Sequence, residues 1–245
     1  METYQIATDD VLGMLKDVAF AAGGDKGARA YIAGVYLHTT KNTLRMAATD
    51  GHYLAVSERG IPENGKQLPG VLVPNNIVKV LPHVLRGSPV TTIEIDAKTL
   101  RFTGASNAVS APIPDGSYPD YQRCVPDDLP YTLRVKSKDM SKALKALLPC
   151  VDRALKQPVV KVEIRHQELA VTTVSGSGRV TEEWIHPYHY NGPPMEIGLK
   201  IKYLSKLTSM IKGELAMGLY HNRSPVLIRE TDNPNKFYAL AQCRV

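Results

Sequence analysis

The sequence predicts an α+β protein of two domains, each built from helices packed on β-sheet. Two observations lead to this prediction. A proline-rich segment stands near the midpoint of the 245 residues, and an order of one helix followed by about three strands recurs four times. The helices are expected to begin near residues 9, 75, 138 and 201. Since repeated units bury their apolar faces against each other, each domain should be a pseudo-twofold pair of helix-plus-β units.

The segment 111–126 is predicted to be an ordered connector between the two domains. Its four prolines fix φ and remove backbone donors, which excludes a helix or a central strand. A flexible linker would be rich in Gly and Ser, whereas this one carries Tyr118 and Tyr121, whose rings favour packing. We therefore expect one domain over 1–127 and another over 128–245.

In the first half, helices are predicted from an apolar period of 3.6 residues and strands from runs bounded by turn signals. A strand-like start at 4–7 precedes the first helix, for which Thr8 is the expected cap and Asp9 and Asp10 are favoured in the first turn. Pro82 is expected to kink the second helix or end it near Leu81. The other strands expected here are 34–39, 43–48, 52–57, 92–95, 99–103 and 108–113.

The second half repeats this order. Ser137 is the expected cap of the third helix, and Gly213 is expected to stop the fourth. The Ser-Gly-Ser-Gly segment at 175–178 should form a turn. The strands expected here are 159–165, 169–174, 180–185, 195–199, 215–220, 226–230 and 237–242.

Composition bounds the class of protein. Hydrophobic residues at 43% suffice for two cores, but no apolar run is long enough to span a bilayer and the N-terminus lacks the features of a signal peptide, so a cytoplasmic protein is expected. Cys124, Cys150 and Cys243 are an odd number at wide spacing, which fits neither a disulfide framework nor a zinc site. Buried free thiols are expected.

Charge is unevenly distributed along the chain. The net charge is +6, yet residues 1–127 hold 12 Lys and Arg against 13 Asp and Glu, while the remainder holds 18 against 11. A polyanionic partner of the second half would account for this asymmetry. A solvated lysine-rich surface is the alternative.

Basic residues recur on one face of three of the four expected helices, while the first helix has only Lys16 among its acids. One such row is ordinary for a solvated helix, but recurrence at matching places in the repeat favours a phosphate-facing surface with sequence-independent contacts. The rows are Lys79, His83 and Arg86 in the second helix, Lys138, Lys142 and Lys145 in the third, and Lys202 and Lys206 in the fourth.

No motif typical of catalysis is present. The glycines of 23–27 lack the spacing of a phosphate loop, and 175–178 lacks the strand-to-helix context of a nucleophile elbow. His186 and His189 lack a third metal ligand, and His52 fits a turn better than a general base. We expect no enzymatic activity, no metal and no cofactor.

Three segments together resemble a known family. Residues 48–55 read Ala-Thr-Asp-Gly-His-Tyr-Leu-Ala, residues 114–121 read Pro-Asp-Gly-Ser-Tyr-Pro-Asp-Tyr, and residues 195–198 read Met-Glu-Ile-Gly. They resemble the bacterial β sliding clamp, the β subunit of DNA polymerase III. The resemblance runs from Tyr4 to Val245, but only to the second and third of that family's three domains.

The resemblance implies a ring of six clamp domains around duplex DNA, with helices on the inner face and sheets outside. Such a ring works topologically: it slides on DNA and tethers a polymerase, and weak phosphate contacts suit sliding. Because this chain matches two domains, three chains would supply six, and a head-to-tail interface can close such a ring. We therefore expect a nucleoid-associated homotrimer.

The resemblance also implies a cleft between the second and third domains that takes short linear peptides of polymerase and clamp-loader subunits. Carried over by motif position, its lining here would be Ile32, Thr49, Gly51, His52, Tyr53, Leu54, Pro119, Arg123, Cys124, Tyr203, Ala239, Ala241, Arg244 and Val245.

Some residues depart from the family pattern. Tyr53 stands where Arg is usual, Lys200 stands where a helix-capping Asn is usual, and the Ala-Gln-Cys-Arg-Val tail at 241–245 replaces a Met-rich ending, which implies a changed peptide preference. The alternative function is a non-encircling clamp-like protein, a decoy or modulator of clamp-dependent partners, suggested by the acidic first helix and the altered tail. We take Met1 as a true start rather than a truncation, and an origin in a phage, plasmid or integrated element as a further hypothesis.

Overall fold

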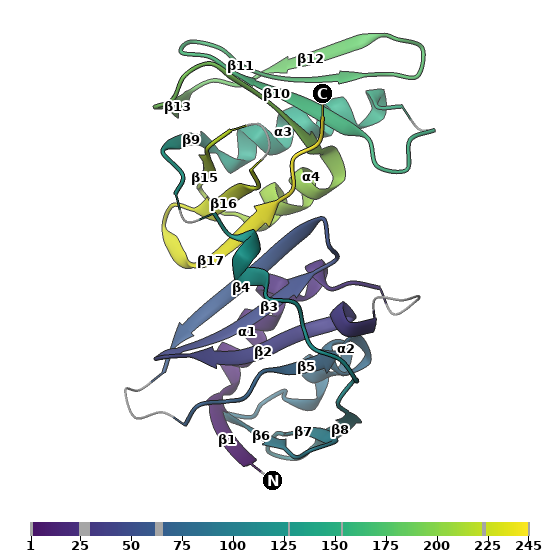
Figure 1. Cartoon of the computed structure of the whole chain (residues 1–245), viewed down its shortest axis with the longest axis vertical. Coiled ribbons are helices and arrows are strands. Elements are labelled where there is room, and N and C mark those ends of the chain that lie inside the picture. The colour runs from purple at the N-terminus through teal and green to yellow at the C-terminus, as the bar shows by residue number, and fades with distance from the viewer. Residues whose placement is uncertain are drawn as a thin grey trace. The chain divides into compact units, whose positions relative to one another are not determined.

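A computed structural model describes residues 2–24, 30–61, 66–126, 128–152, 154–221 and 224–244 (Figure 1). The fold is α+β, as predicted, and the chain divides into two compact units, Met1–Asp120 (unit 1) and Tyr121–Val245 (unit 2). The division falls inside the proline-rich connector, before the boundary expected at residue 127. The short 3₁₀ turns lie at Ala19–Ala21, Ala30–Ile32, Tyr121–Cys124 and Leu148–Cys150.

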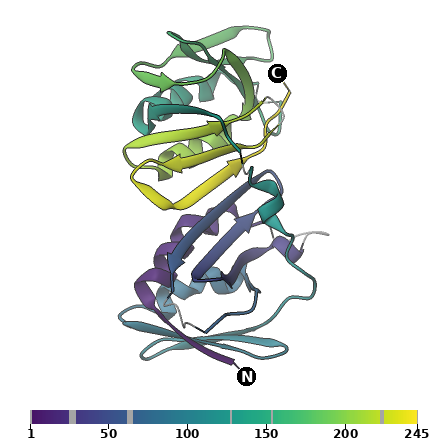
Figure 2. The same ribbon diagram turned by 60° about the vertical axis from the view of Figure 1, so that its left-hand side comes forward.

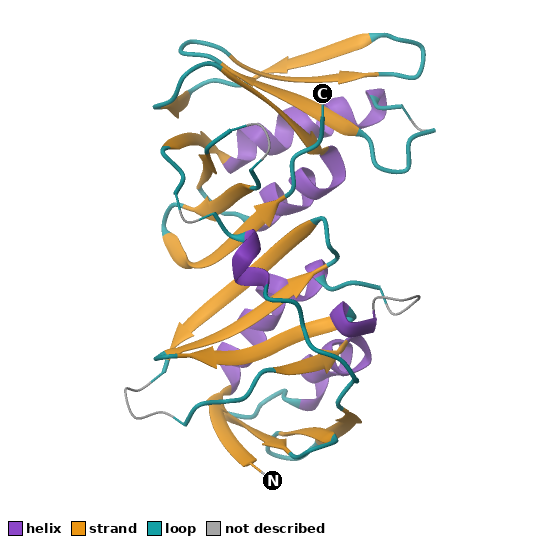
Figure 3. Cartoon of the chain, in the orientation of Figure 1, coloured by secondary structure: helices purple, strands orange, loops and turns teal. Residues whose placement is uncertain are grey.

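Unit 1 packs two helices, α1 (Thr8–Val18) and α2 (Asn75–Val84), against two layers of strands (Figure 3). One sheet has the strand order β1-β6-β7-β8, and in the other layer the order is β4-β3-β2-β5. The strands are β1 (Glu2–Ala7), β2 (Gly34–Thr40), β3 (Thr43–Thr49), β4 (Tyr53–Gly60), β5 (Val71–Pro74), β6 (Val90–Ile95), β7 (Thr99–Thr103) and β8 (Ala108–Pro112).

Unit 2 repeats this plan with α3 (Ser137–Leu147) and α4 (Ile201–Met210), which lie side by side (Figures 1 and 2). Its sheets have the orders β12-β11-β10-β14 and β13-β9-β15-β16-β17. The strands are β9 (Tyr131–Lys136), β10 (Val159–Ile164), β11 (Leu169–Val174), β12 (Val180–Trp184), β13 (Tyr188–Tyr190), β14 (Met195–Lys200), β15 (Glu214–Leu219), β16 (Val226–Glu230) and β17 (Asn233–Leu240).

The predicted fourfold repeat is confirmed, and each repeat also has a strand that leads directly into its helix. This leading strand pairs antiparallel with the first strand that follows the other helix of its unit. The sequence predicted two of these leading strands, β1 and β14, but missed β5 and β9. Their partners lie in the other repeat, so local patterning carries little information about them. Exchange of leading strands ties the two repeats of a unit into one core.

The junction between leading strand and helix has the same hydrogen bond in all four repeats. The first helical residue donates its N–H to the carbonyl of the residue just before the exchanged partner strand, which is β6, β2, β15 or β10. These bonds satisfy N–H groups that a helix start leaves unpaired. The four bonds are Thr8 to Pro89 at 3.1 Å, Asn75 to Ala33 at 3.2 Å, Ser137 to Gly213 at 2.9 Å and Ile201 to Pro158 at 3.1 Å.

The expected helix caps at Thr8 and Ser137 were wrong. Both residues are the first residues of their helices, the N-cap positions are Ala7 and Lys136, and neither helix has a side-chain cap bond. Each hydroxyl is buried and bonds to the other repeat instead: Thr8 Oγ1 lies 2.8 Å from Thr91 Oγ1, and Ser137 Oγ donates to the Thr208 carbonyl at 2.6 Å. The strand running straight into the helix leaves no free turn in which a cap could form.

Two further expectations are corrected in part. Helix α2 does not end near Leu81 but continues through Pro82 to Val84, since a proline in the last turn forfeits only one intrahelical bond. The other alternative, a kink at Pro82, stays a prediction. The cysteines are free, as predicted, but they are not buried: Cys124 is exposed and Cys150 and Cys243 are half-buried. They lie in 3₁₀ turns and in the C-terminal tail, outside the layers that form the cores.

The connector packs as expected. The Tyr118 ring stacks on Tyr36 of β2 with centroids 4.5 Å apart and nearly parallel planes, and Tyr121 is buried. Among the described helices, none is long and apolar enough to cross a bilayer.

Candidate nucleic-acid interface

Helix α3 separates apolar and basic residues onto opposite faces. Met140, Leu144 and Leu147 are fully buried. Lys138, Lys142 and Lys145 are all exposed. Because i, i+4 and i+7 positions share one side of a helix, the three ammonium groups form a single row pointing away from the core.

The rows on α4 and α2 are also exposed. Lys202 and Lys206 lie opposite the buried Leu204 and Leu207 of α4. On α2, the solvent side carries Lys79 and His83, whereas Arg86 stands in the turn after that helix. Every basic residue predicted for DNA contact is therefore accessible within its own unit.

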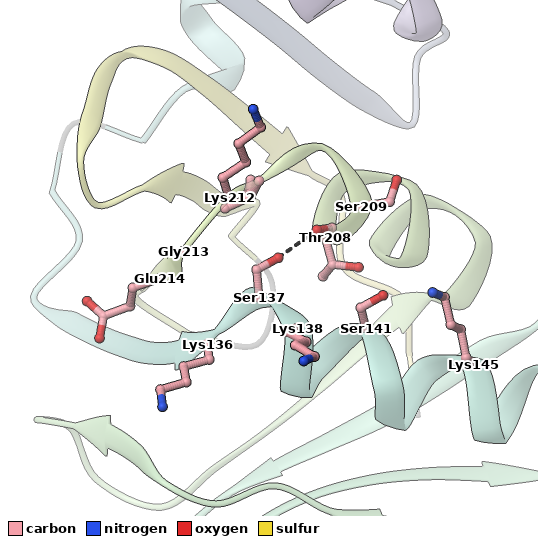
Figure 4. A pocket seen from close by; sticks show the side chains of 11 residues that line it. Lys136, Ser137, Lys138, Ser141, Lys145, Thr208, Ser209, Lys212, Gly213 and Glu214 are labelled. Carbon is pink, nitrogen blue, oxygen red and sulfur yellow. Dashed lines mark hydrogen bonds between the residues drawn. The ribbon is translucent and has the colours of Figure 1, made fainter.

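Unit 2 has an open groove between the start of α3 and the segment that follows α4 (Figure 4). Its volume is about 790 Å³, and the Ser137 to Thr208 hydrogen bond joins its two walls. Four lysines line it, together with hydroxyl groups and one carboxylate. The lining residues are Lys136, Ser137, Lys138, Ser141, Lys145, Thr208, Ser209, Ile211, Lys212, Gly213 and Glu214.

Sequence reasoning missed two of these lysines, Lys136 and Lys212. Neither belongs to a helical row, because Lys136 ends β9 and Lys212 comes after the last residue of α4. The backbone N–H of Lys212 donates to Glu230 Oε1 at 2.9 Å, and Gly213 takes a φ of 78° at the turn into β15. The signal that could have found Lys212 is its position just beyond the C-terminus of α4, because the helix dipole favours a positive charge there.

Helix α1 has the opposite charge character. Asp10 and Asp17 both lie beside Arg59 of β4, at 3.3 Å and 4.0 Å, and Ser57 Oγ donates to Asp17 at 3.0 Å. These contacts neutralise part of the acidity of α1 from within unit 1. Asp9 is exposed in its first turn.

The predicted peptide-binding residues of unit 1 gather around the β3–β4 hairpin. Thr49 Oγ1 donates to the Tyr53 carbonyl at 2.7 Å and accepts from the Gly51 N–H at 3.0 Å. The His52 N–H donates to Asp50 at 2.8 Å. These bonds fix the hairpin turn and leave Gly51 and His52 exposed.

The neighbouring members of this set differ in exposure. Tyr53 stacks on Phe20 and donates its hydroxyl to the Phe20 carbonyl at 2.7 Å, so it serves the packing of unit 1. Leu54 and Ile32 are also buried, whereas Pro119 is exposed in the connector.

The predicted peptide-binding residues of unit 2 come from three segments. The 3₁₀ turn at the start of the unit exposes Arg123 and Cys124, and Tyr203 is half-buried on α4 with Lys200 Nζ 5.4 Å from its ring centroid. The last members belong to the C-terminal segment: Ala239 is buried in β17, Ala241 and Arg244 are exposed in the tail, and Val245 lies outside the described residues.

The tail is attached to unit 2 by backbone hydrogen bonding. Cys243 bridges to Gly198 of β14, and its N–H donates to the Gly198 carbonyl at 2.8 Å. Lys200, which replaces the expected capping Asn, occupies the N-cap of α4 without a side-chain cap bond. Within the described residues, no group of three His, Cys, Asp or Glu is placed so that it could hold a metal ion.

Comparison with known proteins finds similarity to one family. The family model described as "DNA polymerase III beta subunit, central domain" matches residues 5–120, which is nearly the whole of unit 1. The β sliding clamp of Caulobacter vibrioides is 27% identical over 98% of this chain. The chain is similar to β sliding clamps over nearly its whole length, and these matches support that family.

Solved clamps have the same fold. The Caulobacter crescentus β sliding clamp matches all of this chain with a TM-score of 0.90 at 26% identity, and the Bartonella birtlesii clamp matches 99% of it with a TM-score of 0.89 at 26% identity. Helices and sheets of both units therefore follow the clamp fold that the sequence predicted. The chain spans 65% of the length of the Caulobacter relative and 66% of the two solved clamps.

Proposed function

We propose that this chain is a DNA sliding clamp, a processivity factor that encircles duplex DNA and carries no catalytic activity of its own. The observation that carries the proposal is the pair of exposed lysine rows on α3 and α4, which stand at equivalent places in two clamp repeats beside a lysine-lined groove. Such contacts neutralise phosphates without reading base sequence and weaken as salt rises.

The proposed ring contains three copies of the chain. Unit 1 matches the central domain of the family, and we assign residues 128–245 to the third clamp domain. Three chains of two units would supply the six domains that the family resemblance implies, and a head-to-tail contact can close with cyclic symmetry.

We further propose that polymerase and clamp-loader subunits bind through short linear peptides. The exposed members of the predicted set include His52 and Pro119 in unit 1 and Arg123 and Arg244 in unit 2, and this exposure supports the proposal. Two related clamps support the idea: one was solved with polyethylene glycol at its "putative beta-motif tethering region" and one was solved bound to griselimycin.

Retention on circular DNA tests the function. Protein diluted until its oligomers separate is mixed with nicked circular plasmid, concentrated, and passed over a sizing column in enough salt to strip simple phosphate contacts. A sliding clamp co-elutes with the circle and dissociates after a restriction enzyme linearises the plasmid. Equal dissociation from both forms of DNA would contradict the proposal.

No observation on the described residues favours the alternative, a non-encircling decoy of clamp-dependent partners. The acidity of α1 that suggested it is partly neutralised by Arg59. A decoy would bind peptide ligands but would show no difference between circular and linear DNA, so the same assay distinguishes the two functions.

A further inference from the structure

The leading strand of the first helix has a covered outer side in unit 2 and an uncovered one in unit 1. Strand β13 pairs antiparallel with β9 and so covers the outer side of that leading strand. Strand β1 holds the same place in unit 1 as β9 does in unit 2. It ends the order β1-β6-β7-β8, and within the described residues no strand pairs with its outer side. An edge of this kind presents backbone groups that can bind another strand.

The junction hydrogen bonds align β1 and β9 residue by residue. Thr8 and Ser137 are equivalent, because each is the first helical residue and donates to the opposite repeat. Counting back three residues from each, Gln5 of β1 corresponds to Arg134 of β9. Arg134 is paired with His189 of β13, whereas β6 is the only described strand that pairs with Gln5.

The outward backbone groups of β1 follow from its register. Alternate residues of β1, in step with Thr8, bond to β6. The remaining residues, Thr3, Gln5 and Ala7, direct their N–H and C=O groups to the uncovered side. Among the described residues, the contact found there runs from Lys66 Nζ to the Thr3 carbonyl at 3.5 Å. The N–H and C=O of Gln5 are therefore available to an added strand.

Side-chain burial shows the same difference between the units. Tyr188 of β13 stands directly opposite Val135 of β9, and residues in this position share one face of a sheet. Val135 is 1% exposed. Its equivalent in β1 is Ile6, which is only half-buried. Ile6 thus lacks the cover that a neighbouring strand gives to Val135.

A pocket of about 360 Å³ lies beside this edge of β1. Its volume is within the range of roughly 300–1,000 Å³ that is usual for ligand-binding clefts. Leu44 and Leu68 are buried in its wall, so the pocket offers an apolar surface next to open backbone groups. The residues that line the β1 pocket are Thr3, Tyr4, Gln5, Ile6, Thr39, Leu44, Ile61, Lys66 and Leu68.

The covered edge in unit 2 indicates which side chains fit the uncovered one. A strand that runs antiparallel to β1 meets Ile6 first, then Gln5, then Tyr4. A large apolar side chain opposite Ile6 would fill the pocket as Tyr188 covers its own neighbour. A small apolar side chain fits opposite Tyr4, because Tyr4 is larger than its counterpart Leu133 in β9.

Hydrogen bonding and charge indicate the next position of such a strand. In unit 2, Asn191 follows β13, and its Oδ1 accepts the Thr132 N–H at 2.6 Å. The equivalent group in unit 1 is the outward N–H of Thr3. Lys66 Nζ lies beside it, 4.7 Å from the centroid of the Tyr4 ring. A carboxylate at this position would accept the Thr3 N–H and pair with the Lys66 ammonium group.

We propose that unit 1 binds a partner protein through an extended peptide that adds antiparallel to the uncovered edge of β1. The peptide carries an aromatic residue, any residue, a small apolar residue and an acidic residue, in that order. In this mode of recognition, main-chain hydrogen bonds supply affinity and alternate side chains supply specificity. The site shares no residue with the sets predicted for DNA contact and peptide binding, and it does not depend on the proposed function.

A charge-swap experiment tests the proposal. The probe is a fluorescein-labelled Gly-Tyr-Thr-Val-Asp-Gly peptide, which should bind the parent saturably in fluorescence anisotropy. K66E should weaken its binding roughly two- to fivefold, the range of an exposed ion pair. A peptide with lysine in place of aspartate should bind the parent weakly and regain affinity with K66E. No saturable binding to the parent, or no recovery in the swapped pair, would overturn the proposal.

Proline substitution tests the backbone contact. The Gln5 N–H makes no bond to β6, so Q5P should fold, and loss of an outward donor should weaken peptide binding at least roughly tenfold. S110P is the matched control, since it lies on β8, the opposite edge of the same sheet, and its N–H makes no bond to β7. Unchanged binding by folded Q5P, or an equal loss in S110P, would contradict the proposal.

Hydrogen exchange on the parent chain locates the bound peptide without any substitution. With saturating Gly-Tyr-Thr-Val-Asp-Gly peptide, mass spectrometry should show slower amide exchange in residues 2–7, because their outward N–H groups gain partners. Exchange in the β3–β4 hairpin, which holds part of the predicted peptide-binding set, should stay unchanged. Slowing at the hairpin and none in residues 2–7 would overturn the assigned surface.

Discussion

Helices α1 and α3 occupy the same place in the repeat, yet their outer surfaces carry opposite charge. Both run on from a leading strand, donate from their first residue to the opposite repeat and bury an apolar face. On α3 the exposed face carries three lysines, and on α1 it carries Asp9, Asp10 and a single Lys16.

The difference separates what the fold requires from what a partner requires. The buried apolar face and the junction hydrogen bond are requirements of the fold, and α1 and α3 share both. The outer face is free to vary, because surface charges contribute little to folding. We infer that unit 2 supplies most of the attraction to DNA.

Reversing the α3 row should have the largest effect. The triple variant K138E/K142E/K145E removes three positive charges and adds repulsion, so its affinity for duplex DNA should fall at least roughly tenfold. The slope of log affinity against log salt should shrink by roughly 0.9 for each phosphate that is no longer neutralised. Fluorescence anisotropy with duplexes of unrelated sequence across a salt series measures both quantities.

The matched control changes charge by the same amount elsewhere. K41E/K98E/K156E reverses three exposed lysines in turns and bends, outside the helical rows. If this control weakens DNA binding as much as the α3 variant does, net charge rather than the helix face governs binding, and the contrast between α1 and α3 does not explain it.

A change at Pro119 should affect peptide recognition and leave DNA binding intact. Griselimycin, which was solved bound to a related clamp, serves as the probe. P119Q should weaken its binding about tenfold by calorimetry, since a polar side chain would replace an apolar one in the proposed site. P69Q, at an exposed proline outside the predicted set, is the control; an equal effect in both variants would argue against the assignment.

Adding a positive charge to α1 should make it resemble α3. D9K replaces an exposed carboxylate in the first turn with an ammonium group and should raise DNA affinity about two- to fivefold. The same anisotropy assay measures it. Unchanged affinity would mean that α1 does not face the DNA as α3 does.

The smallest of the predicted effects is a pH dependence of folding stability that arises in unit 1. Burial lowers the pKa of His38 below its ordinary value of 6.5, with Arg45 on the facing strand acting in the same direction and a backbone hydrogen bond opposing it. His38 therefore binds a proton less readily in the folded chain than in the unfolded chain. The stability that this difference contributes should be full above pH 6.5 and should fall as the pH drops below that value.

H38Q tests this dependence. Thermal unfolding of the chain, followed on both sides of pH 6.5, should show a smaller destabilisation by acid in the variant than in the parent. An identical acid effect in both would assign it to other groups.

The sequence predicted what local patterns encode. The four helix starts, the β3–β4 turn at Asp50-Gly51 and the basic rows all follow from spacing within a few residues. It missed β5 and β9, because the partners of these strands lie in the other repeat. It missed Lys136 and Lys212 because the groove that joins them forms only when α3 packs beside α4.

The roles of two hydroxyl groups were also beyond local reasoning. Thr8 and Ser137 have the residue type of helix caps, but each is the first residue of its helix, and its hydroxyl is buried against the opposite repeat and bonds there. A cap is a local feature, and here the packing of two repeats overrides it.

The mass of the protein in solution is the sharpest test of the proposed ring. Light scattering on a sizing column, over a wide range of protein concentration, should show a species that approaches three times the chain mass of 26.9 kDa and does not grow further, because a closed ring has no free edge. A single chain at every concentration, or a mass that keeps rising without a plateau, would contradict the proposed ring.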